Sequence, residues 1–172
     1  NKMATQYLVS VENLKKQGLI HQNSDTKILA VAIKRVQEMN IQPATGSPLF
    51  RALLVRVASG VWTADYSELM DDYVVPALVS LVDYKVALLS NVKIVNKAVG
   101  RSSDENITAN TTSETISFRD ELHKDAEFYL ERLIGFLRDD CGTKYPEYNE
   151  AITRTNHDMK KIKTGYRINW TA

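Results

Sequence analysis

Cysteine is almost missing from this 172-residue chain, which contains only Cys141. A single cysteine cannot form an intrachain disulfide, and it cannot supply the paired thiols of a CxxC redox motif or of a zinc site. The chain also lacks an apolar signal core at its start, which reads Asn1-Lys2-Met3. Both absences favour assembly in a reducing cytoplasm over secretion.

An excess of charge of either sign is missing too, because 22 Lys and Arg residues face 21 Asp and Glu residues. The overall balance therefore requires no polyanionic partner. The single long apolar run, residues 73–92, carries Asp83 and Lys85 near its middle. Each of these charges would cost roughly 2.5 to 3.5 kcal/mol at a bilayer centre, so we expect no membrane span. With 44% hydrophobic residues, the chain is sufficient for one domain with a core.

Recognisable catalytic and metal-binding motifs are not found. The three histidines are far apart and share no metal-ligand spacing: His21, His123 and His157. His123 and Glu127 are four residues apart, which is more typical of a solvated pair on a helix surface. The acidic clusters, which we expect at helix ends or beside a kink, are Glu68 with Asp71-Asp72 and Asp139-Asp140. No glycine-rich phosphate loop or nucleophile elbow is present. We therefore expect no enzyme activity, no metal and no cofactor.

Helical signals occupy most of the remaining sequence. Ser10 is a suitable N-cap for a helix to Gln17, which Gly18 would end in the left-handed conformation. Three- and four-residue apolar spacing predicts a second helix from about residue 24 to Asn40. The segment 42–46 contains proline and glycine and predicts a linker. A third helix, from Pro48 to about Ala58 with Ser47 as N-cap, would be closed by Gly60.

The second half of the chain predicts two longer helices. One extends from about Ala64 to Ser90 and should kink at Pro76, because proline cannot donate a backbone hydrogen bond. Beyond Pro76 this helix is apolar almost all round, so we expect neighbouring subunits to complete its burial. The other begins at Ser117 and continues to about Leu137, with an apolar stripe formed by Phe118, Leu122, Ala126, Tyr129, Leu130, Leu133, Ile134 and Leu137.

These signals together predict a mainly α protein. The expected fold is a helical bundle with a kinked central helix, a short extended or β segment near residues 92–99, a long polar loop and extended terminal arms. The polar composition of residues 101–115 predicts a mobile loop. The expected divisions are an N-terminal arm (1–10), a helical domain (11–148) and a C-terminal basic and aromatic tail (149–172).

The tail is the segment whose composition most clearly suggests binding. Its five basic residues, Arg154, Lys160, Lys161, Lys163 and Arg167, outnumber Glu150 and Asp158. Its end alternates apolar and polar residues, so an extended chain would place Tyr166, Ile168 and Trp170 on one side. Arg167 and the aromatic rings could bind nucleic acid through charge and stacking. Alternatively, Tyr166, Arg167, Ile168 and Trp170 could dock onto an apolar groove or a sheet edge of a partner protein.

Several segments carry a resemblance to a known group of phage proteins, and they span roughly residues 28–148. They are Arg35–Glu38, Ile41–Phe50, Leu69–Leu78, Ile94–Val99, Ala126–Leu133 and Tyr145–Tyr148. In order and spacing they resemble the head-to-tail adaptor or ring proteins of crAss-like and related Bacteroidetes phages. More loosely, they resemble the portal-bound connector proteins of long-tailed phages.

The resemblance implies a structural virion protein without catalytic residues. It implies a head-tail connector ring of about twelve copies beneath the portal, with genomic DNA passing through its channel without sequence-specific binding. The implied partners are copies of the same chain, the portal protein and other connector or tail ring proteins, with no membrane. The implied location is the virion, after assembly in the bacterial cytoplasm. The alternative is a small helical nucleic-acid-binding module that uses the basic tail.

Overall fold

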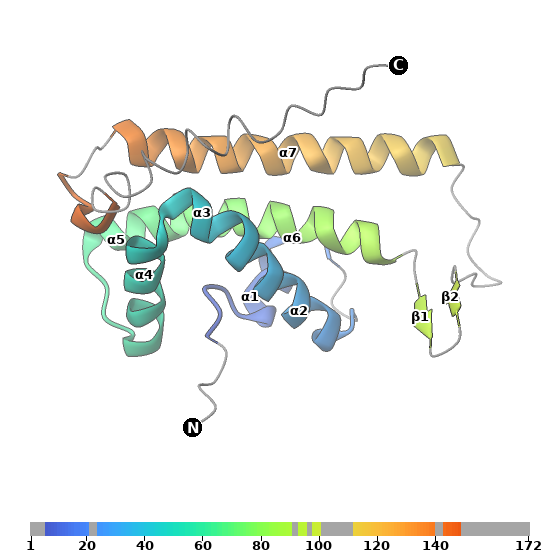
Figure 1. The fold of residues 1–172 in the computed structure, drawn as a ribbon, viewed down its shortest axis with the longest axis horizontal. Helices are drawn as coiled ribbons and strands as arrows, with labels where there is room; N and C mark the ends of the chain where they lie inside the picture. Colours follow the sequence, from blue (N-terminus) through green and yellow to red (C-terminus); the bar gives the residue numbers. More distant parts are fainter. Residues whose placement is uncertain are drawn as a thin grey trace, which may run out of the picture.

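The protein is mainly helical, and two long antiparallel helices form its axis (Figure 1). The structure is a computed structural model and describes residues 6–20, 24–90, 93–95, 98–100, 112–139 and 143–148. Helix α6 (Val75–Ser90) lies at the centre, with α7 (Thr112–Asp139) along one side and α2 (Thr26–Val36) on another. None of the helices within these ranges is long and apolar enough to cross a membrane.

The first helices begin at side-chain caps. Helix α1 (Val11–Gln17) starts after Ser10, whose side chain accepts a hydrogen bond from the N–H of Asn13, as predicted. Asp25 caps α2 in the same way through the N–H of Lys27. Gly18 ends α1 with φ −90° and ψ 174°, so the expected left-handed conformation is wrong. Its backbone is extended, and any residue could adopt it.

The helical path that begins with α2 continues through Pro43, beyond the expected end near Asn40. Helix α2 is followed by a π-helical turn, η1 (Gln37–Ile41), and then by α3 (Gln42–Thr45), so the expected linker at 42–46 is largely helical. The N–H of Gln42 donates to the carbonyl of Gln37, five residues back. In a regular α-helix the ring of Pro43 would crowd the carbonyl four residues back, and the wider turn gives the ring room.

A π-helical segment also precedes Pro76. Helix α5 (Ala64–Glu68) leads into the π-helical segment η2 (Leu69–Val74), where the N–H of Val75 donates to the carbonyl of Met70. Helix α6 then starts with Val75 and Pro76. Each proline therefore follows a widened turn that lets the helical path continue.

Glycines separate α4 (Ser47–Ser59) from its neighbours. Gly46 has φ 77° and ψ 150°, a conformation that side chains disfavour, and it takes the N-cap position expected for Ser47. Ser47 is instead the first helical residue, and its hydroxyl accepts a hydrogen bond from Gln42 Nε2 at 3.1 Å. Gly60 ends α4 in the left-handed conformation, as predicted.

Two short strands lie between α6 and α7. Strand β1 (Lys93–Val95) pairs antiparallel with β2 (Ala98–Gly100). Helix α7 begins at Thr112, five residues earlier than the expected start at Ser117, and therefore includes the last part of the expected loop at 101–115. Residues 101–111 of that loop lie outside the described residues.

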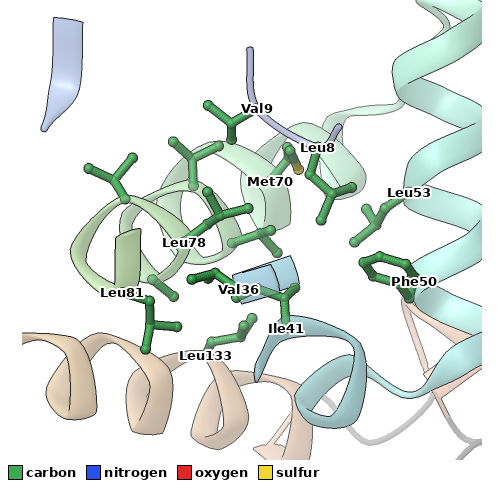
Figure 2. Close-up of a cluster of buried hydrophobic side chains, with 14 of the residues drawn as sticks. Leu8, Val9, Val36, Ile41, Phe50, Leu53, Met70, Leu78, Leu81 and Leu133 are labelled. Carbon is green, nitrogen blue, oxygen red and sulfur yellow. The ribbon is translucent and has the colours of Figure 1, made fainter. Parts of the chain in front are cut away.

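The core forms where α2, α4, η2, α6 and α7 meet (Figure 2). On α6, nearly every residue from Val75 to Asp83 is buried within this single chain, so the expected subunit contacts are not needed to cover that stretch. Leu8 and Val9 are buried as well, so part of the expected N-terminal arm packs against the core. On α7, Leu122, Ala126, Leu133 and Leu137 are buried, whereas Phe118 is 57% exposed and was wrongly assigned to the apolar stripe.

Candidate functional site

The residues predicted to bind a partner, Tyr166, Arg167, Ile168 and Trp170, lie outside the described residues. The same holds for His21, His157, Asp140 and Cys141. The structure does describe residues 143–148, the segment that immediately precedes the tail. The candidate site therefore lies where the helical body meets the start of the tail.

Four aromatic rings join this segment to the helical body, and we call them the aromatic clasp: Tyr66, Tyr73, Phe136 and Tyr145. Tyr66 of α5 and Tyr145 pack edge to face, with ring centroids 5.3 Å apart. Tyr73 of η2 stacks on Phe136 of α7, with ring centroids 3.8 Å apart. The ring of Phe136 also faces that of Tyr145, with centroids 6.1 Å apart. Offset and edge-to-face pairs of this kind contribute beyond the area that they bury.

Hydrogen bonds fix the orientation of the clasp. The hydroxyl of Tyr66 donates to Oε2 of Glu147, and the hydroxyl of Tyr145 donates to the backbone carbonyl of Asp65 at 2.8 Å. The guanidinium of Arg56 lies over the Tyr66 ring, 3.6 Å from its centroid. Burial, followed by the hydrogen bond and negative charge of Glu147, raises the pKa of Tyr66 to about 12. Tyr66 is therefore a neutral donor at physiological pH.

Two charged contacts surround the clasp. The guanidinium of Arg132 lies over the ring of Tyr73, 4.8 Å from its centroid. Lys144 Nζ is 3.8 Å from Glu68 Oε2 in a half-exposed ion pair.

Tyr148, the last described residue, is buried and donates its N–H to the carbonyl of Tyr145 at 3.0 Å. The clasp thus fixes the place on the body from which the tail starts.

A hollow of about 300 Å³ lies between α1, α4, α5 and η2. Its floor consists of four buried apolar side chains: Leu8, Val9, Met70 and Val75. Three of them, Leu8, Val9 and Met70, lie together at one edge of the core (Figure 2). The half-buried side chains of Val57 and Trp62 form its walls. A hollow with an apolar floor suits an apolar or aromatic side chain of a partner.

The rim of the hollow is polar and carries one acidic side chain, that of Asp71. It includes Asn13 and Gln17 of α1, together with Ser67 and Asp71. Residues 64–74, which form α5 and η2, contain four acidic residues and no basic one, and all four are exposed: Asp65, Glu68, Asp71 and Asp72. A ligand that combines an apolar group with positive charge would match both features.

The sequence alone did not indicate the clasp or the hollow. Tyr66 and Glu147 are 81 positions apart, and no local spacing connects them. The hollow combines residues from five helical elements and from the segments that precede α1 and α5. Aromatic residues near segment ends were the only signal, and they carry no information on which rings meet.

The other sequence candidates remain on the surface. His123 Nδ1 lies 3.5 Å from Glu127 Oε2 with both side chains about half exposed, so this is the solvated pair that the spacing predicts. Asp71 and Asp72 are exposed in η2, and Asp139 is exposed at the end of α7. Within the described ranges, no group of three or more His, Cys, Asp or Glu side chains is arranged to hold a metal ion.

Comparison with curated proteins and with solved structures gave no match. Comparison with protein families gave one, which covers residues 41–157. That stretch includes α4 to α7, the aromatic clasp and the floor residues Met70 and Val75. The chain therefore belongs to the family of unknown function DUF6712.

Proposed function

We propose that the chain is a structural subunit of the head-to-tail connector ring of a tailed phage. The observation that carries the proposal is the clasp, which fastens the start of a basic and aromatic tail to a helical body. A docking arm needs such a fixed origin, because the arm can then reach only a limited set of neighbours. This arrangement suits a ring subunit that joins several different partners.

The resembling segments also meet at this end of the molecule. Arg132, in the segment Ala126–Leu133, stacks on Tyr73, in the segment Leu69–Leu78. Helix α3, in the segment Ile41–Phe50, packs against α7. Tyr145 and Tyr148 belong to the same core as these elements. Their convergence supports a common structural role for segments that are distant in the sequence.

In this proposal the central helical region, from Ala64 to Ser90, bends at Pro76, and a short β segment follows it near residues 92–99. The widened turn before Pro76 and the strands β1 and β2 support this description. The partners are copies of the same chain, the portal and adjacent connector or tail rings, at the head-tail interface of the virion. Genomic DNA passes through the ring without sequence-specific contacts.

The burial of α6 within one chain changes which surfaces can join the copies. Self-association must use other apolar groups, since residues 75–83 are already covered. Phe118 and Phe128 on α7 are 57% and 61% exposed, and the hollow is open. These surfaces and the tail are the candidates for contacts between subunits.

The test is light scattering followed by electron microscopy of the purified full-length chain, alone and mixed with its portal. The proposal expects closed rings in one of the two samples. A monomer in both samples that binds duplex DNA tightly, with affinity falling steeply as salt rises, would instead favour the nucleic-acid-binding alternative.

A further inference from the structure

We propose that the hollow between α1, α4, α5 and η2 receives the tail of a second copy of this chain, with Trp170 entering it. The inference rests on the proposed ring and names a contact that would join its subunits. The occupant is residues 166–170 of the neighbouring copy. Its apolar side chains meet the floor, and Arg167 meets the acidic side chain of Asp71 at the rim.

The chemistry of the hollow matches the end of the tail. The floor of Leu8, Val9 and Met70 is apolar, and Trp62 offers an aromatic wall. Aromatic side chains that fill such pockets commonly dominate the binding energy of an interface. An indole also carries one N–H donor, and Asn13, Gln17 and Asp71 provide acceptors around the rim. Trp170 can therefore bury its ring while its donor is satisfied.

Charge complementarity supports the same occupant. Residues 149–172 contain five basic and two acidic residues, whereas residues 64–74 contain four acidic and no basic residues. Arg167 is three positions from Trp170, close enough for the side chain of Arg167 to reach Asp71 or Asp72 when Trp170 occupies the hollow. Opposite charges at the rim favour encounter and fix the direction of the docked segment.

The length of the tail suits a contact between copies. The tail begins after Tyr148, which the clasp fixes near α5. The 17 residues 149–165 can span up to about 55 Å when extended, so the tail is long enough to leave its own body and bind a neighbouring copy. A tail that enters the hollow of the next copy makes a heterologous contact, and repeating that contact gives a ring when the rotation between copies closes and an open filament when it does not.

Disulfide trapping tests the contact in full-length protein. Cys141→Ser removes the native thiol from every variant. One variant then carries Thr171→Cys and the other carries Gln17→Cys on the rim. The two are mixed under mild oxidation, and the covalent product is separated on a denaturing gel. Glu127→Cys on the exposed surface of α7 replaces Gln17→Cys as the matched control.

The expected result is a linked pair of chains with Gln17→Cys and little with Glu127→Cys. Adding Trp170→Ala should lower the yield by roughly tenfold, in keeping with loss of an aromatic anchor. Asp71→Lys should also lower the yield of linked chains. The loss should be larger at low salt than at high salt, because salt screens the charges at the rim. A link within one chain, in a variant that carries both cysteines, would mean that each tail fills its own hollow and would overturn the inference. Absence of any link would overturn it as well.

The disulfide-trapping experiment can fail without the proposed function failing, and the reverse also holds. Rings that assemble without the link would leave the connector proposal standing and refute the hollow as the receptor. A link between copies that form no ring, with or without the portal, would support the contact and contradict the connector role.

Discussion

Gly18 lies so close to Asp83 that a Cβ atom at position 18 would come within 2.7 Å of Asp83 Oδ1. It would also lie 3.0 Å from the carbonyl oxygen of Leu14. The other carboxylate oxygen of Asp83 accepts a hydrogen bond from the N–H of Leu19 at 2.9 Å. Close approach, rather than a left-handed backbone, therefore requires glycine here. This contact fastens the end of α1 to the central helix α6.

Gly18→Ala should destabilise the fold by about 1 to 3 kcal/mol, because the added methyl group must displace a buried carboxylate or helix backbone. Gly135→Ala is the matched control, since nothing lies within 4 Å of its Cβ position in α7. Alanine there should stabilise the helix by about 0.5 to 1 kcal/mol. Urea unfolding measures both effects. Equal stabilities for the two variants would contradict the close contact.

The pH dependence of stability should contain a contribution from Asp83. Burial raises the pKa of this carboxyl group, and the hydrogen bond from Leu19 only partly opposes the shift. The folded state therefore holds the proton more tightly than the unfolded state. The resulting stabilisation is complete below the unfolded pKa and is lost as pH rises through the folded pKa.

Asp83→Asn removes this contribution while keeping an oxygen that can accept the Leu19 hydrogen bond. The stability of the variant relative to the natural protein should therefore increase as pH rises above the ordinary pKa of an aspartate, because the folded natural protein then loses its stabilising proton. Urea unfolding at a series of pH values measures the difference. A difference that stays constant with pH would contradict the raised pKa.

Tyr66→Phe should loosen the attachment of residues 145–148. The substitution removes the hydrogen bond to Glu147 and should cost about 1 to 2 kcal/mol. Amide exchange at Tyr148, whose N–H is bonded to Tyr145, should become faster. Tyr73→Phe is the control, because it retains the ring stack on Phe136.

An absorbance titration provides a second measurement of the same residue. The natural protein should contain a tyrosine that ionises at about pH 12, and Tyr66→Phe should lack it. If the high-pH component persists in Tyr66→Phe, it belongs to a different tyrosine, and the assignment fails.

Two residues of the predicted apolar stripe of α7, Leu133 and Phe118, differ in burial. Leu133 is fully buried, and Leu133→Ala should cost about 2 to 5 kcal/mol. Phe118→Ala should change stability by no more than about 0.5 kcal/mol, because its side chain is 57% exposed. Thermal and urea unfolding compare the two. Similar losses in both variants would show that Phe118 is part of the core.

Local signals were sufficient where the structure depends on neighbours in the sequence. Ser10 caps α1, Gly60 ends α4, and four of the eight residues of the apolar stripe of α7 are buried, all as short-range patterns predict. The linker predicted at Pro43 is wrong, because the effect of a proline depends on whether the preceding turn can widen. Ile41 and Thr45, on either side of Pro43, are fully buried, and the sequence does not reveal this long-range packing.

Contacts between residues that are distant in the sequence could not be predicted from the sequence pattern. The importance of Gly18 comes from Asp83, which is 65 positions away on another helix. The clasp depends on Tyr66 meeting Tyr145, and the hollow depends on Leu8 and Val9 reaching Met70. In each case composition indicated a buried or aromatic residue, but its partner was set by how the helices pack.

The most direct test of the connector proposal is the copy number of this chain in purified virions. Quantitative mass spectrometry would compare it with the portal protein, and labelling with electron microscopy would locate it. The proposal predicts a copy number equal to that of the portal and a position at the head-tail interface. Absence from purified virions, or a copy number typical of the capsid shell, would contradict it.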